Sequence, residues 1–186
     1  MATASVRCNA RAGRPRNGHG PVTPIDRYSL EPHSGPYESW PTTSILRVDG
    51  QRSAARAPGF QIEAQYATAL GDLLITSYDC PFEESNSFVL VDASLRIRAR
   101  AQLLVPYSTY LLHEHWPIDD VTLGLHYHEA VFYTLHVVPP GGWLRRKPRL
   151  RLRPRPAWKS DARMVEAYER LQAKLTDIAA SRATWS

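Results

Sequence analysis

The chain has 186 residues, of which 43% are hydrophobic and 22% charged, and its formal net charge is +5. This length suits one well-cored domain with appendages, and no apolar run approaches the roughly 18 residues that a membrane-spanning helix needs. Two cysteines are too few for a disulfide scaffold, which fits a reducing compartment, and the N-terminus lacks the apolar core of a secretory signal. We therefore expect a cytoplasmic protein that does not enter a membrane.

Charge is divided sharply along the chain. Residues 1–60 carry a net charge of +4, residues 61–140 carry −7 and residues 141–186 carry +8. An acidic middle between two basic ends indicates either neutralisation within the molecule or two surfaces for different partners. Because 20 of the 23 basic residues are arginine, genome composition is an alternative explanation to selection for arginine chemistry.

The N-terminal part, residues 1–58, contains seven prolines with several glycines and serines. No apolar periodicity survives among them, so we expect an irregular arm rich in proline and arginine. The one short strand expected in this part is "TSILRVDG", residues 43–50, which ends in an Asp-Gly turn signal.

Residues 59–157 predict an antiparallel β-domain that is a sandwich or a partly open barrel and ends in an arginine-rich edge strand. Short runs of β-type residues are separated by turn residues, and no helix interrupts them, which argues against a parallel arrangement. In "LRIRARAQL", Arg96, Arg98 and Arg100 alternate with apolar residues. A period of two is typical of a strand with one solvated face.

Two H-x-H pairs flank the sequence "WPIDD", which predicts a β-hairpin turn. A four-residue loop, 117–120, would pair Trp116 with Val121 and place all four histidines on one face. Since neutral imidazole is a common ligand of zinc and related metals, they are candidate ligands of a divalent metal ion. These residues are His113, His115, His126 and His128. The alternative is a polar or subunit-facing sheet surface without metal.

The segment "WLRRKPRLRLRPRPAWK", residues 143–159, has the strongest compositional bias. In an extended conformation its alternating arginines line one side about 6.6–7 Å apart, close to the spacing of phosphates along a nucleic-acid strand. Tryptophans at both ends offer stacking platforms for bases. The candidate nucleic-acid or anion-binding residues are Trp143, Arg145, Arg146, Lys147, Arg149, Arg151, Arg153, Arg155 and Trp158.

Two other interpretations of this segment remain open. Its prolines confine it to an edge strand or an extended linker, and an edge strand uses charge to prevent aggregation. The arginines also suit neutralisation of the acidic part of the same or a neighbouring subunit.

Residues 158–186 predict a C-terminal helix docked on the domain, because apolar residues recur at steps of three and four between residues 160 and 180.

Catalytic sequence signatures are absent: there is no Gly-rich phosphate loop, no G-x-S-x-G and no C-x-x-C. We therefore expect a non-enzymatic binding subunit of a larger assembly or oligomer that contacts nucleic acid or an acidic protein through its arginines. One alternative is a metal-dependent enzyme built on the histidines. Another is an immunity or antitoxin-type protein that covers a basic partner with its acidic β-domain.

Overall fold

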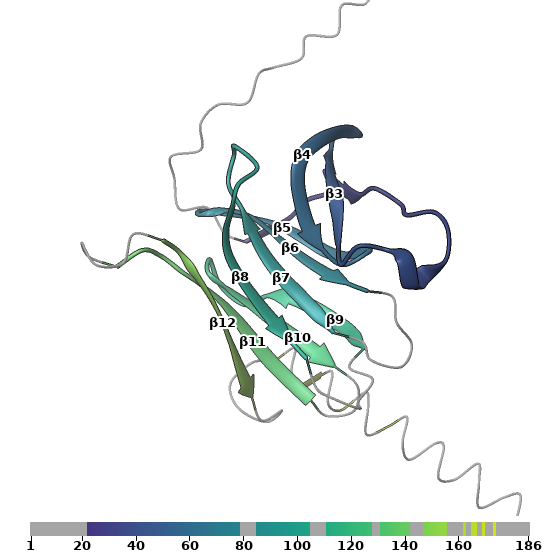
Figure 1. The fold of residues 1–186 in the computed structure, drawn as a ribbon. Coiled ribbons are helices and arrows are strands. Elements are labelled where there is room, and N and C mark those ends of the chain that lie inside the picture. The colour runs from purple at the N-terminus through teal and green to yellow at the C-terminus, as the bar shows by residue number, and fades with distance from the viewer. Residues whose placement is uncertain are drawn as a thin grey trace, which may run out of the picture.

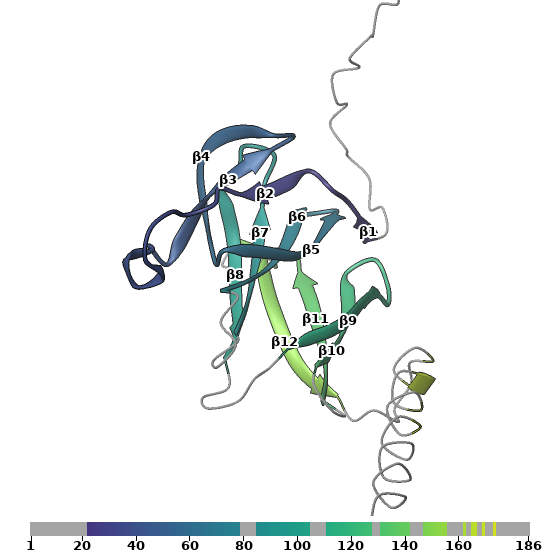
Figure 2. The ribbon, with the colours of Figure 1, turned by 90° about the vertical axis from the view of Figure 1, so that its right-hand side faces the viewer.

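The computed structural model describes residues 22–78, 85–104, 111–127, 131–141 and 147–155, together with residues 162, 165, 166, 169 and 173. The described chain is mainly β, with three antiparallel sheets and one short 3-10 turn, η1 (Tyr37–Ser39), and its strands do not form a closed barrel (Figures 1 and 2). The predicted antiparallel β-architecture is confirmed. In this part of the chain no helix is both long and apolar enough to cross a membrane.

The central sheet contains five strands in the order β1-β5-β6-β7-β8. They are β1 (Thr23–Pro24), β5 (Gln61–Thr68), β6 (Gly71–Ser77), β7 (Asn86–Val91) and β8 (Ile97–Leu103). The two middle strands, β6 and β7, are buried along most of their length, and their side chains alternate between two hydrophobic cores. This double burial explains why their sequences are nearly continuous apolar runs.

The C-terminal sheet has the order β12-β11-β10-β9 and covers one face of the central sheet. Its strands are β9 (Leu112–Pro117), β10 (Thr122–Tyr127), β11 (Val131–Val138) and β12 (Arg149–Arg155). The core between the two sheets includes Phe88 and Leu90 from β7 and Leu123 and Leu125 from β10. At one side of this core β8 and β12 run close together, with Cα atoms within 8 Å of each other (Figure 1).

The N-terminal sheet covers the other face of the central sheet and consists of β2 (Tyr28–Leu30), β3 (Thr43–Val48) and β4 (Gln51–Pro58). The expected strand at 43–50 is confirmed: Asp49 and Gly50 form its turn with φ of 50° and 79°, as a tight hairpin requires. The expectation that the rest of the arm is irregular is wrong for residues 22–58, where β2 and β4 pair with the expected strand. The inward positions of β4 are small alanines, which give a weak hydrophobic signal.

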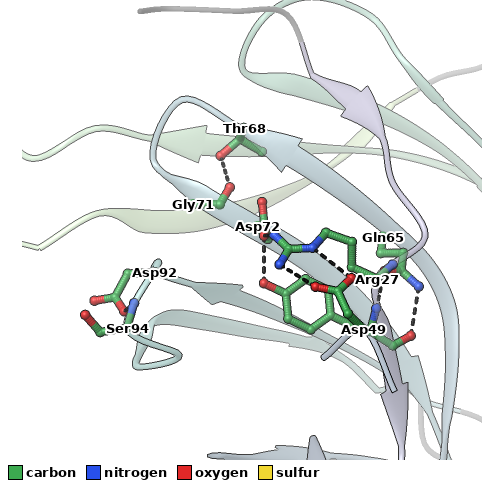
Figure 3. A network of polar contacts seen from close by, with 9 residues as sticks. Arg27, Asp49, Gln65, Thr68, Gly71, Asp72, Asp92 and Ser94 are labelled. Atoms are coloured by element: carbon green, nitrogen blue, oxygen red, sulfur yellow. Dashed lines mark hydrogen bonds and ion pairs between the residues drawn. The ribbon is translucent and has the colours of Figure 1, made fainter. Parts of the chain in front are cut away.

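A polar network fastens the N-terminal sheet to the central sheet (Figure 3). Tyr28 donates a hydrogen bond of 2.6 Å from its hydroxyl group to Asp72. The pKa of Tyr28 is raised, first by burial and then by this hydrogen bond. Arg27 lies beside the same carboxylate at 3.9 Å and pairs with Asp49 at 2.8 Å. The network therefore has a structural role, because it spans residues from β2, the β3–β4 turn and β6.

The predicted C-terminal helix falls almost entirely outside the described residues. Five described positions, Ala162, Val165, Glu166, Glu169 and Ala173, have helical backbone. Its docking on the domain stays a prediction.

Candidate functional site

Strand β12 forms one edge of the C-terminal sheet and carries a row of four arginines. Among the described strands it pairs only with β11, from Arg155 opposite Phe132 to Arg149 opposite Val138. All four arginines of the strand are exposed, whereas Leu150 is buried and Leu152 is partly buried against the core. The alternating sequence thus places its guanidinium groups on the outward face of an edge strand, as predicted. We call Arg149, Arg151, Arg153 and Arg155 the arginine row.

No carboxylate of the described residues forms an ion pair with the arginine row. The ion pairs in the described part of the chain join Arg27 to Asp49 and Asp72, Arg52 to Glu31, and Arg98 to Asp92. Within the row, the Nε of Arg155 donates a long hydrogen bond of 3.5 Å to the hydroxyl of Thr134. Neutralisation within this part of the chain therefore does not account for the row.

His136 on β11 lies directly opposite Arg151 in the sheet. Its ring is held by two threonine hydroxyls, with Nδ1 3.1 Å from Thr122 Oγ1 and Nε2 3.0 Å from Thr134 Oγ1. The pKa of His136 is lowered, first by burial and then by the positive charges of Arg153 and Arg155. This histidine was not among the candidates from the sequence, because nothing there showed that β11 and β12 would pair.

A second set of arginines lies on the adjacent edge strand. Arg98 and Arg100 point away from the core on β8, while the alternate residues Ala99 and Ala101 pack into it. Since β8 and β12 are close together, two arginine-bearing edges meet at one side of the domain. Arg98 is paired with Asp92 at 3.2 Å. The sequence predicted the alternation in each strand, but it did not predict that these strands would be neighbours.

Acidic side chains gather at the opposite edge of the same two sheets. Glu114 lies on β9, the edge strand farthest from β12, and Asp119 and Asp120 follow in the β9–β10 turn. Glu63 lies on β5 and Asp26 just after β1, at the side of the central sheet opposite β8. Basic and acidic side chains therefore lie at opposite edges of these two sheets, although Arg98 and Arg100 come from the acidic middle of the sequence and Asp26 from its basic N-terminal part.

The histidine hairpin has a different register from the predicted one. Gly124 pairs with Trp116, Leu125 with His115 and His126 with Glu114, so the expected pairing of Trp116 with Val121 is wrong. The turn is shifted by one residue relative to the predicted loop, to residues 118–121, because Pro117 is taken up into β9 opposite Leu123. Within this turn Asp119 Oδ1 accepts a hydrogen bond of 2.9 Å from Val121 N. A proline is tolerated there because β9 is an edge strand.

This register separates the histidines. His115 faces the same side as Leu125, and its Nδ1 lies 2.5 Å from the Tyr66 hydroxyl of the central sheet. Partial burial lowers the pKa of His115, although the charge of Glu63 opposes this effect. His126 is buried on the other face and stacks on Phe132 at 4.5 Å.

Gly124 leaves room for the Trp116 indole, because a Cβ at this position would overlap that ring.

His113 lies near His126, with ring centroids 5.8 Å apart. His128 lies outside the described residues. Within the residues that the structure describes, no group of three histidine, cysteine or acidic side chains is arranged to hold a metal ion.

Lys147, just before the arginine row, is exposed. Trp143, Arg145, Arg146 and Trp158 lie outside the described residues.

In comparisons with known proteins, no family model, curated protein or solved structure matches this chain. Its function must therefore be inferred from its own residues.

Proposed function

We propose that this chain is a non-enzymatic binding subunit of a larger assembly and that the arginine row contacts nucleic acid. The observation that carries the proposal is the row itself: four exposed guanidinium groups on one edge strand, with no carboxylate partner among the described residues. In this proposal a sandwich-like β-domain presents the row, and Arg100 of β8 extends the positive surface around the edge. An acidic protein surface is the alternative partner for the same arginines.

Spacing favours nucleic acid over an acidic protein. Alternate residues of a strand stand about 6.6–7 Å apart, which suits consecutive phosphates of an extended single strand better than irregularly placed carboxylates. The described aromatic rings on this sheet face are not available for stacking, since Phe132 is 1% exposed and Trp116 is 4% exposed. Contacts by this part of the surface would therefore be with phosphates, and we expect binding to tolerate changes of base sequence.

The salt dependence of binding tests this proposal. We expect the protein to bind a short fluorescein-labelled oligothymidine, with the logarithm of Kd rising with the logarithm of salt concentration at a slope of about 3, because four phosphate contacts to a single strand release about 0.7 counterions each. Fluorescence anisotropy measures this slope. Absence of binding at low salt would contradict the proposal, and binding of polyglutamate in preference to the oligonucleotide would favour an acidic protein partner.

His136 offers a site-specific reporter of binding. Burial and then the charges of Arg153 and Arg155 lower the pKa of His136, so an anion that neutralises these two charges should raise it. By linkage, affinity for the anion should increase as the pH falls through the titration of His136. NMR titration of the imidazole with and without oligothymidine measures the shift. In the free protein, Arg153→Gln with Arg155→Gln should also raise the pKa, and an unchanged pKa on binding would place the anion elsewhere.

The metal-dependent alternative has less support, because His115 lies on the other face from His126. The immunity-type alternative would use the acidic edge of the domain, and not the arginine row, to contact a basic partner.

A further inference from the structure

A cleft of about 490 Å³ opens at the acidic edge, between strands β1 and β5 of the central sheet and strand β9 of the C-terminal sheet. It lies on the opposite side from β8 and β12, where the two sheets come together. Pro24, Ile25, Ile62 and Pro117 supply apolar walls. The size and mixed lining are typical of a site for a small ligand or a single side chain.

The Glu63 carboxylate is placed in the cleft by a β-bulge. The pairing of β5 with β6 shifts between Ile62 and Ala64, so Glu63 has no partner of its own in the sheet. A bulge changes the direction of a side chain in this way at many binding sites. One oxygen, Oε1, accepts a hydrogen bond of 2.5 Å from Ser77 Oγ. The structure shows no donor from the described residues at the second oxygen, which leaves it available to a ligand.

A hydrogen-bonded pair from the two sheets lies beside Glu63. The Tyr66 hydroxyl is 2.5 Å from His115 Nδ1, and both residues line the cleft. This contact joins β5 to β9 and fixes the distance between the walls. This contact engages the Tyr66 hydroxyl and His115 Nδ1, and the ionised carboxylates are the strongest hydrogen-bond acceptors among the described residues that line the cleft.

A second carboxylate, Asp26, lines the same cleft. It is exposed, and its described hydrogen bond, from Gln65 Nε2, is long at 3.5 Å. No lysine or arginine is among the described residues that line the cleft. The adjacent Arg27 forms an ion pair with Asp49 at 2.8 Å. No ion pair between described residues neutralises Glu63 or Asp26.

We propose that this cleft binds a guanidinium or ammonium group carried on a short aliphatic stem. Glu63 and Asp26 would receive the cation from two sides, with bidentate contacts in the case of a guanidinium. The apolar walls would contact the methylene groups, as they do with arginine and lysine stems generally. Such a group occurs on a free amine or on a basic side chain of a partner protein. This site is separate from the arginine row and does not depend on the proposed function.

Two probes, measured by isothermal titration calorimetry on the full chain, distinguish these sources. Agmatine represents the free amine, and a capped alanine peptide with one central arginine represents the protein side chain. We expect saturable one-site binding, weakened about tenfold or more by Glu63→Gln, because hydrogen bonds to charged groups are about twice as strong as those between neutral groups. Asp26→Asn should weaken binding in the same direction. Tighter binding of the peptide would identify a protein partner, and tighter binding of agmatine would identify a small molecule.

Glu38→Gln is the matched control, because Glu38 is an exposed carboxylate in the η1 turn and does not line the cleft. Glu63→Gln retains an acceptor for Ser77, so the fold should be preserved, and a thermal melt checks this. If Glu63→Gln binds oligothymidine with unchanged affinity, the cleft and the arginine row are separate binding sites. The proposal is overturned if neither probe binds, or if Glu63→Gln and Glu38→Gln bind the probes equally well.

Discussion

Replacing Arg151 and Arg153 with glutamate is expected to lower the affinity for oligothymidine at least about 25-fold in 0.1 M salt. Each phosphate contact to a single strand contributes roughly a factor of five at that concentration, and the introduced carboxylates add repulsion. The slope of log Kd against log salt should also fall by about 1.4, because two contacts are lost. Anisotropy titrations at several salt concentrations measure both quantities.

Arg52→Glu with Arg56→Glu provides the control for net charge. These exposed arginines lie on β4 of the N-terminal sheet, so this variant changes the formal charge equally but leaves the arginine row intact. We expect it to retain most of the affinity and the full slope. If both double variants lose affinity to the same extent, the interaction depends on net charge alone and the arginine row is not the binding site.

The sequence predicted the strands best where a single face is buried. In β8 and β12 the exposed arginines alternate with residues that pack into the core, and both strands occur where the period of two placed them. It also predicted that β12 would be an edge strand, from its charge and its prolines. What it did not predict was the proximity of β8 to β12, since this depends on how two sheets pack and not on either local pattern.

The histidine hairpin shows why register was harder to predict. The predicted turn of four residues kept leucines on one face, but the observed register is associated with the Asp119 turn and with the fit of Trp116 over Gly124. These are tertiary and side-chain effects that a polar-apolar pattern does not contain. The N-terminal sheet was missed for a related reason, because alanines in β4 become core residues only once the central sheet is present.

A core truncation should show whether the three sheets unfold together. Phe88 is fully buried between the central and C-terminal sheets, and Leu74 is fully buried between the central and N-terminal sheets. Phe88→Ala is expected to reduce the free energy of unfolding by about 3–5 kcal/mol and Leu74→Ala by about 2–5 kcal/mol, through lost burial and the cavity left behind. Leu104→Ala, at a position that is 54% exposed, should change it by less than about 0.5 kcal/mol.

The shape of the unfolding curve carries the second part of this prediction. Neighbouring residues of β6 and β7 alternate between the two cores. Loss of either core therefore exposes one face of these strands and weakens the strands that the other core also needs. Both truncations should therefore shift one cooperative transition in urea, seen identically by tryptophan fluorescence and circular dichroism. A separate early transition in Leu74→Ala, with the remaining signal unchanged, would show that the N-terminal sheet unfolds independently and that β6 and β7 do not couple the two cores.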